Sequence, residues 1–456
     1  MSDKSLNVTK KNKYEIDMCN GTIMDKLISF AIPLLLSSVL QLMFNAVDII
    51  VVGRFSGSRA LAAVGSTTAL INVFVNLFIG ISLGVNVLAA RFYASGKNKE
   101  MSETVHTAIT LAVVSGVTMA AIGFICAKPA LQLMGTPSDV IGQSTLYMRI
   151  YFLGMPFFML YNYGAAVLRA VGDTKRPLFF LIIAGITNVV LNMILVIAFD
   201  MGVAGVAIAT IISQMISCVL VLRCLSRSEG SYQLHISKLG IKTYYLKQIF
   251  SVGLPAGVQS VVISISNALL QSSVNSFGST AMAGYTSANN ILSFLYVSIN
   301  SVTQACMSFT SQNYGVRKYK RMDRVLLDCM ILTVVVSSVL GCAAYIFGHQ
   351  ILGIYTNETE VIKCGMEILS ISTIPYFLCG IMDLFPGALR GMGYSAVPMI
   401  LSIIGTVGTR IVWIFGVFPN NRSLYVLFIS YPASWAITIV LQVTCFLLVR
   451  RKVHSS

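Results

Sequence analysis

Polar side chains that can bind a cation lie within otherwise apolar stretches of the sequence. Asp48 follows Gln41 and Asn45 by seven and three residues. In a helix, this spacing places all three side chains on one face. A charged side chain is costly in lipid, so a carboxylate there is a functional candidate. Carboxylate and amide oxygens bind hard cations, and this face is therefore a candidate cation site.

Two later stretches, 177–199 and 203–225, predict a helical hairpin that brings further oxygens to the same depth. The turn of this hairpin is expected near Met201. Asn192 and Thr210 each lie nine residues from that turn, about 13 Å along a helix axis. Asp48 lies about eight residues before the turn near Ser56, which is expected on the same side of the membrane as the hairpin turn. One carboxylate, an amide and a hydroxyl at one level predict a pocket for a hard monovalent cation.

Asn188 and Gln214 form a second layer of the hairpin, each thirteen residues from its turn. Asn188 adds another amide oxygen to the predicted pocket, and Gln214 is a supporting candidate together with Gln41 and Asn45. A structural interpretation also stays open, because Asn and Thr often join membrane helices through hydrogen bonds.

Asp383 is the other acidic residue well inside an apolar stretch, seven residues before Arg390. Arg410 lies in the next stretch, at a depth that differs by about 7 Å, a gap that an arginine side chain partly spans. Two interpretations stay open for Asp383 and Arg410. They form an ion pair that is structural or gates movement, or Asp383 is a functional carboxylate of a second site.

The elements that position these residues must be membrane helices. Hydrophobic residues make up 56% of the 456 residues and charged residues 11%, against about 25% in soluble proteins. This excludes a soluble enzyme, a disordered chain and a disulfide-rich secreted domain. Twelve apolar segments are long enough to span a bilayer: 27–52, 61–89, 105–126, 144–168, 177–199, 203–225, 249–275, 282–310, 325–347, 366–389, 397–419 and 423–449.

Charge placement predicts the orientation of these segments. The net charge is +15, and 25 of the 32 Lys and Arg residues fall on the side of the termini, against five on the other. Positive loops stay in the cytoplasm, so both termini are expected there. The basic charge is thus a topology signal and an attraction to anionic membrane lipid, with no nucleic acid as partner.

The chain is expected to divide into two six-helix lobes. The predicted parts are a cytoplasmic tail 1–25, an N-lobe 26–225, a cytoplasmic linker 226–248, a C-lobe 249–449 and a C-terminal tail 450–456. The ten cysteines are scattered without a CxxC pair, so we expect no disulfide or metal role for them.

An internal repeat supports this division. Leu168-Arg169-Ala-Val-Gly172 through Pro177 recurs as Leu389-Arg390-Gly-Met-Gly393 through Pro398, 221 residues later. Six helices separate the copies, so the halves are parallel repeats about an axis along the membrane normal. The second-half equivalents of Asp48, Asn188 and Asn192 are Leu270, Thr409 and Trp413, so a cation site belongs to the first lobe.

These motifs together resemble the multidrug and toxic compound extrusion (MATE) transporters. The motifs are Pro33-x7-Gln41-x3-Asn45-x2-Asp48-x4-Gly53, the loop Leu-Arg-Ala-x-Gly-Asp-Thr-Lys-x-Pro with its degenerate copy, and Asn188-x3-Asn192. The resemblance covers about residues 25 to 450.

The resemblance implies a secondary active antiporter, and not an enzyme, that exports cationic amphipathic drugs by alternating access. It exchanges them for sodium ions or protons and needs no cofactor. Asp48, Asn188, Asn192 and Thr210 match positions implicated in binding the coupling ion, and are metal ligands if that ion is sodium. Position 192 is often Asp in relatives. Some relatives bind sodium in the second lobe through a Glu on helix 7 and an Asp on helix 10; helix 7 here lacks an acid, and the family Asp falls nearer Cys379 than Asp383. A monomer in a cell membrane, the inner membrane of a bacterium, is expected.

Other functions fit less well. A flippase for lipid-linked sugars is the alternative within the wider superfamily, but it would be expected to carry several intramembrane cations, and only Arg149 and Arg410 lie inside the segments. A major-facilitator carrier would show a Gly-x-x-x-Asp-Arg-x-Gly-Arg-like loop after helix 2, where Arg91-Phe-Tyr-Ala-Ser-Gly-Lys stands. A primary pump would show a phosphate-binding Gly-x-x-x-x-Gly-Lys-Ser/Thr loop, which the sequence lacks.

The charge count predicts opposite sides of the membrane for the linker and the last outer loop. Cysteines introduced at Ser228 and Ser423, in a background without the native cysteines, should react with an impermeant thiol reagent from opposite sides. Labelling of both from the same side would contradict the topology.

Overall fold

The computed structural model describes residues 13–455, apart from the side chain of Ala69. Lys4, Lys10 and Lys11 of the predicted N-terminal tail lie outside the described residues. The described chain is all-helical, and no strand occurs between residues 13 and 455.

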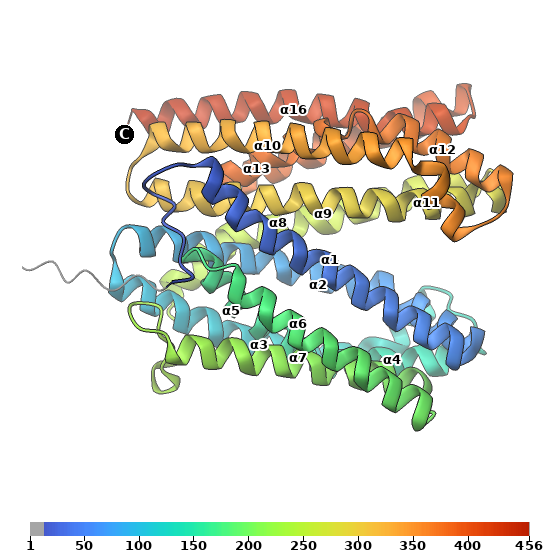
Figure 1. Ribbon diagram of the computed structural model, residues 1–456, viewed down its shortest axis with the longest axis horizontal. Helices are drawn as coiled ribbons and strands as arrows, with labels where there is room; N and C mark the ends of the chain where they lie inside the picture. The colour runs from blue at the N-terminus through green and yellow to red at the C-terminus, as the bar shows by residue number, and fades with distance from the viewer. Residues whose placement is uncertain (1–12, 456) are drawn as a thin grey trace, which may run out of the picture. The chain divides into compact units, whose positions relative to one another are not determined.

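The first six predicted spans correspond to helices of the structure (Figure 1). Those helices are α1 (Met24–Phe55), α2 (Gly57–Ala94), α3 (Asn98–Leu133), α4 (Ile141–Leu153) with α5 (Met155–Ala170), α6 (Lys175–Asn192) with the π-helix η1 (Met193–Ala198), and α7 (Gly202–Arg227). The pair α4 and α5 bends by 44°. The bend lies at Gly154 and Pro156, and proline is a usual cause of a kink in a helix.

The second six spans repeat the pattern. They are α8 (Thr243–Asn275), α9 (Ser279–Gly315), α10 (Tyr319–Ile346) with the short α11 (Gly348–Tyr355), α12 (Thr359–Thr373) with α13 (Tyr376–Gly391), the broken helix 396–420, and α16 (Leu424–His454). The pair α12 and α13 bends by 49° at Pro375. Within the described residues, ten helices are long and apolar enough to cross a membrane, or twelve if each bent pair is one span. The predicted twelve-helix fold is therefore confirmed.

Contacts group the chain into two compact units. Unit 1 comprises Leu40–Ile71, Leu88–Lys247 and the described part of Met1–Gly21, and unit 2 comprises Thr22–Val39, Asn72–Val87 and the described part of Gln248–Ser456. Parts of α1 and α2 thus group with the second half of the chain. The lobe boundaries expected from the repeat stay a prediction.

The linker is held within unit 1 by specific hydrogen bonds. The Tyr232 hydroxyl donates to Glu15 (2.6 Å), which also accepts from Tyr93 (2.7 Å). Burial and the nearby Glu15 raise the pKa of Tyr232 to about 12, so its hydroxyl keeps the proton that it donates. The backbone N–H of His235 donates to Nε2 of His106 (3.0 Å). Ser228 is buried here, so its exposed neighbour Glu229 is the better position for labelling the linker.

The repeated loop motif makes the same turn twice. Gly172 and Gly393 have φ angles of 95° and 92°, a conformation that side chains rarely adopt. Each follows the end of a helix that carries an arginine in its last turn, Arg169 in α5 and Arg390 in α13. Both glycines therefore supply the backbone conformation that this turn requires.

Glycines let α2 and α8 pack backbone against backbone within unit 2. A Cβ on Gly80 would overlap the backbone of Gly257, and one on Gly84 would overlap the carbonyl oxygen of Ile249. Close approach through small residues is a usual mode of helix association in membranes.

We expect Gly84→Ala to destabilise the protein by about 1–3 kcal/mol, because the added methyl group meets rigid backbone. Its apparent unfolding temperature in detergent should fall by several degrees. Gly65→Ala in the same helix is the matched control, since a Cβ there has nothing within 4 Å. Equal unfolding temperatures for the two variants would contradict the close crossing.

Candidate cation site

Asp48 is the centre of a buried polar cluster in unit 1. Its side chain lies in the second half of α1 and the residue is 9% exposed. Asn192 donates to Oδ1 of Asp48 from Nδ2 (2.5 Å), and the hydroxyl of Thr210 lies 3.4 Å from Oδ2. The structure thus brings together α1, α6 and α7 at the residues that the sequence selects.

Asn188 completes the cluster from one turn earlier in α6. Its Oδ1 accepts from Nδ2 of Asn192 (3.2 Å), and both residues are buried. The second amide oxygen, Oδ1 of Asn192, is buried and has no hydrogen-bond partner within the described residues. A buried acceptor without a donor is costly. A cation or a proton on the cluster would remove that cost, so the residues fit a coupling ion.

The ligands available to a cation are one carboxylate and neutral oxygens. Among residues 13–455, no group of three or more His, Cys, Asp and Glu side chains could hold a metal ion. Asp48 forms no salt bridge with a described basic side chain. Its negative charge is therefore compensated only by dipoles, which suits a single monovalent cation better than a divalent one.

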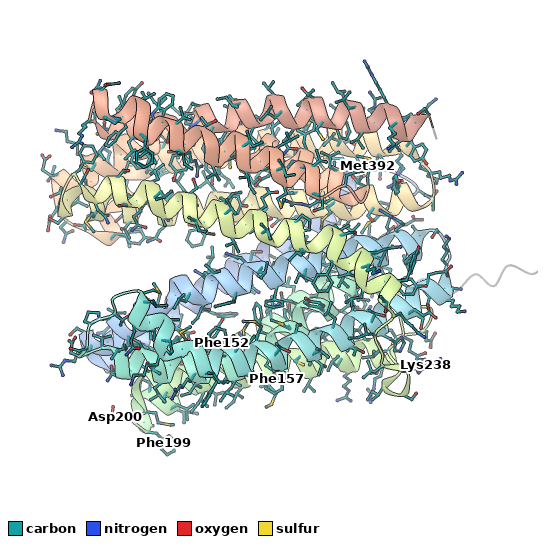
Figure 2. All side chains as sticks on the ribbon, turned by 180° about the vertical axis from the view of Figure 1, so that it is seen from behind. Phe152, Phe157, Phe199, Asp200, Lys238 and Met392 are labelled. Atoms are coloured by element: carbon teal, nitrogen blue, oxygen red, sulfur yellow. The ribbon has the colours of Figure 1, made fainter. Side chains whose placement is uncertain are left out.

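The hairpin of α6 and α7 turns where the sequence predicts. Phe199 and Asp200, both labelled in Figure 2, form the turn, and Asp200 has a positive φ of 52°. The helix widens to the π form at Met193, directly after Asn192. Such segments are frequent at functional sites.

Gln41 and Asn45 do not take part in the cluster. Both side chains are exposed and make no hydrogen bond to other described residues. They share a helix face with Asp48 as predicted, but only Asp48 is at the level where that face is covered by α6 and α7. Gln214 lies near the site through Tyr151 rather than through Asp48.

Sequence reasoning missed two groups that shape the site. Tyr147 and Tyr151 of α4 interact electrostatically with Asp48. Their spacing of four residues predicts that both side chains lie on one face of the helix. Phe44 also packs directly on Gly185 of α6, where any Cβ would overlap the ring. This contact lies one turn from Asp48 along α1 and one turn from Asn188 along α6, and it holds the two helices close.

Unit 2 contains different polar pairs from the ones expected. Asp383 interacts with Arg390 and Tyr296, and Nη2 of Arg390 donates to Oε1 of Gln259 (2.7 Å). Arg410 instead donates to Asn267 (2.7 Å). The Asp383–Arg410 ion pair is not formed, because Asp383 faces Arg390 two turns further along its own helix. The repeat equivalent of Asp48, Leu270, is fully buried in an apolar cluster.

A duplicated bundle of membrane-spanning helices with a buried polar site defines a multi-pass membrane transporter. The family model MatE matches the chain twice, at residues 33–194 and 255–415. The chain therefore belongs to the MATE family of transporters, and the double match confirms the internal repeat.

Individual proteins similar to this chain are also multidrug transporters by name. The probable multidrug resistance protein YoeA of Bacillus subtilis is 30% identical over 421 residues, which cover 90% of this chain and 91% of that protein. The multidrug export protein MepA of Staphylococcus saprophyticus is 22% identical, with coverage of 84% and 85%. An outward-facing MATE transporter structure superposes with a TM-score of 0.88 at 20% identity, covering 98% of this chain and 99% of that one.

The Phe44–Gly185 contact predicts a testable dependence of the site on helix spacing. Gly185→Ala should lower the apparent unfolding temperature by several degrees, because the methyl group and the Phe44 ring compete for one volume. Adding Phe44→Ala to Gly185→Ala should recover part of the loss. If the two substitutions are additive in a double-mutant cycle, the contact does not set the spacing.

Proposed function

We propose that the protein is an antiporter that exports amphipathic organic cations, with Asp48 as the group that couples export to entry of a sodium ion or proton. The observation that carries the proposal is the buried Asp48 carboxylate without a basic partner, beside an orphaned amide oxygen of Asn192. Its family membership and multidrug efflux relatives support drug export.

Coupling follows from charge compensation. A carboxylate among membrane helices is stable only when dipoles or a cation compensate its charge. Asn192, Asn188 and Thr210 supply the dipoles in the structure. An incoming cation replaces the Asn192 donor at Oδ1 and gains the amide oxygens as ligands. The site then differs in net charge before and after binding, and this difference biases the protein between two states.

A sodium ion and a proton would use different atoms of this cluster. A sodium ion would use Asp48, the amide oxygens of Asn188 and Asn192, and the Thr210 hydroxyl as metal ligands. A proton needs only Asp48. With Asn at position 192, the cluster has a single acid, so either exchange moves one charge per site.

The oligomeric state, the membrane and the orientation of the protein belong to the same proposal. The protein acts as a monomer in a bacterial plasma membrane, with both termini in the cytoplasm, in contact with lipid and organic cations and without a cofactor. The 25-to-5 distribution of basic residues supports the orientation.

Asp48→Asn should abolish uphill export of ethidium while preserving the size of the side chain. The neutral amide cannot carry the charge that the coupling ion compensates. Export is measured in proteoliposomes under separately imposed sodium and proton gradients, and the gradient that drives the wild-type protein identifies the ion.

Asp383→Asn is the matched control, because Asp383 is a half-buried acid in a membrane helix and interacts with Arg390. It should affect export less than Asp48→Asn, at equal protein levels. Unchanged uphill export by Asp48→Asn, with the same dependence on sodium and pH, would show that Asp48 is structural.

A further inference from the structure

The linker lies against α3 well inside the end of that helix. The backbone N–H of His235 donates to Nε2 of His106 (3.0 Å), and the backbone N–H of Lys242 donates to Oγ1 of Thr107 (3.3 Å). His106 lies in the third turn of α3, about 12 Å along the axis from its start. The apolar stretch that predicts this helix begins one residue before His106. Residues 235–242 therefore lie at the level where the membrane begins, rather than beyond the helix ends.

Apolar side chains of this segment point away from the protein. Ile236 is 77% exposed, and Leu239 and Ile241 are exposed as well. Tyr244 follows in the first turn of α8 and is 64% exposed. In water such an apolar edge is costly, but the boundary between headgroups and acyl chains stabilises it. The described chain leaves this edge uncovered at the level where a bilayer would meet it.

Two lysines alternate with these apolar side chains. Lys238 ends the 3-10 helix η2 (Ile236–Lys238), and Lys242 directly precedes α8. Both are exposed, and neither forms a salt bridge with a described acidic side chain. Lys238 lies at the periphery of unit 1 (Figure 2). A lysine side chain can lie along an apolar surface and extend its ammonium group to the phosphates of a membrane.

Other exposed lysines on this side of unit 1 lie farther from the apolar stretch. Lys97 and Lys99 are at the turn between α2 and α3, seven to nine residues before His106. Along the axis of α3 this separation is about 10–13 Å. It exceeds the Debye length at physiological salt, which is about 8 Å. A phosphate beside Lys238 is therefore largely screened from Lys97 and Lys99.

We propose that residues 235–242 bind anionic phospholipids, with Lys238 and Lys242 on the headgroup phosphates and Ile236 and Ile241 among the first carbons of the acyl chains. An apolar edge beside two ammonium groups matches an acyl chain joined to a phosphate. The net charge predicts a general attraction of the basic loops to anionic lipid, whereas the geometry assigns direct contact to one segment. The inference is independent of what the protein exports.

Photo-crosslinking from position 236 tests the inference on the full-length protein in vesicles. The photoreactive residue p-benzoylphenylalanine replaces Ile236, and the vesicles contain equal amounts of phosphatidylglycerol and phosphatidylcholine. Mass spectrometry of the crosslinked protein identifies the attached lipid. Phosphatidylglycerol adducts should exceed phosphatidylcholine adducts about fivefold or more, since each lysine near the surface favours anionic lipid by about that factor. The same photoreactive residue in place of Lys97 should give few lipid adducts, because it lies farther from the membrane.

Lys238→Gln together with Lys242→Gln should remove the preference while both lipids still form adducts, because the apolar edge remains. Lys97→Gln together with Lys99→Gln is the matched control, since it removes the same charge from the same side of unit 1 and should keep the preference. Lys238→Arg together with Lys242→Arg should also keep it. Absence of lipid adducts at position 236, equal yields of the two lipids with the native lysines, or equal losses in the two Gln pairs overturns the proposal. The measurement needs no transport, so failure of the proposed export function leaves its result unaffected.

Discussion

Burial of the Asp48 carboxylate is the constraint on which the rest of unit 1 depends. A carboxylate in this position requires donors from neighbouring helices, and water is scarce among membrane helices. Asn192 and Thr210 meet that requirement only if α1, α6 and α7 approach closely at one level. Gly185 permits the approach by leaving space for Phe44. The hairpin turn at Asp200 then fixes which residues of α6 and α7 face each other.

The two halves of the chain show how one backbone framework carries opposite chemistry. Position 48 in the first half and position 270 in the second are equivalent, yet one is a carboxylate and the other a buried leucine. The change is tolerated because an α-helix satisfies its backbone hydrogen bonds internally, whatever side chains it carries. Leu270 packs in the apolar cluster of unit 2, and Arg410 brings the opposite charge from the equivalent of α6.

The sequence was sufficient to predict the twelve spans, the repeat and the grouping of Asp48, Asn188, Asn192 and Thr210. Hydropathy and depth along a helix are properties of one segment, so they can be read without knowing its neighbours. Gln41 and Asn45 show the limit. Their spacing correctly placed them on the face of Asp48, but spacing does not tell where along that face another helix lies. The Glu15 contacts with Tyr93 and Tyr232 join segments 78 and 217 residues apart, and no local pattern indicates them.

Of the two interpretations of Asp383 and Arg410, the ion pair is not formed in the structure, and the reason is physical. Depth estimates compare positions along the membrane normal and ignore the direction in which a side chain points. Asp383 and Arg390 are seven residues apart, so they share a face of α13 and compensate each other within one helix. Arg410 comes from a different element and is left with an amide and a ring. Neither of these carries charge, so a similar depth along the membrane normal does not by itself predict an ion pair.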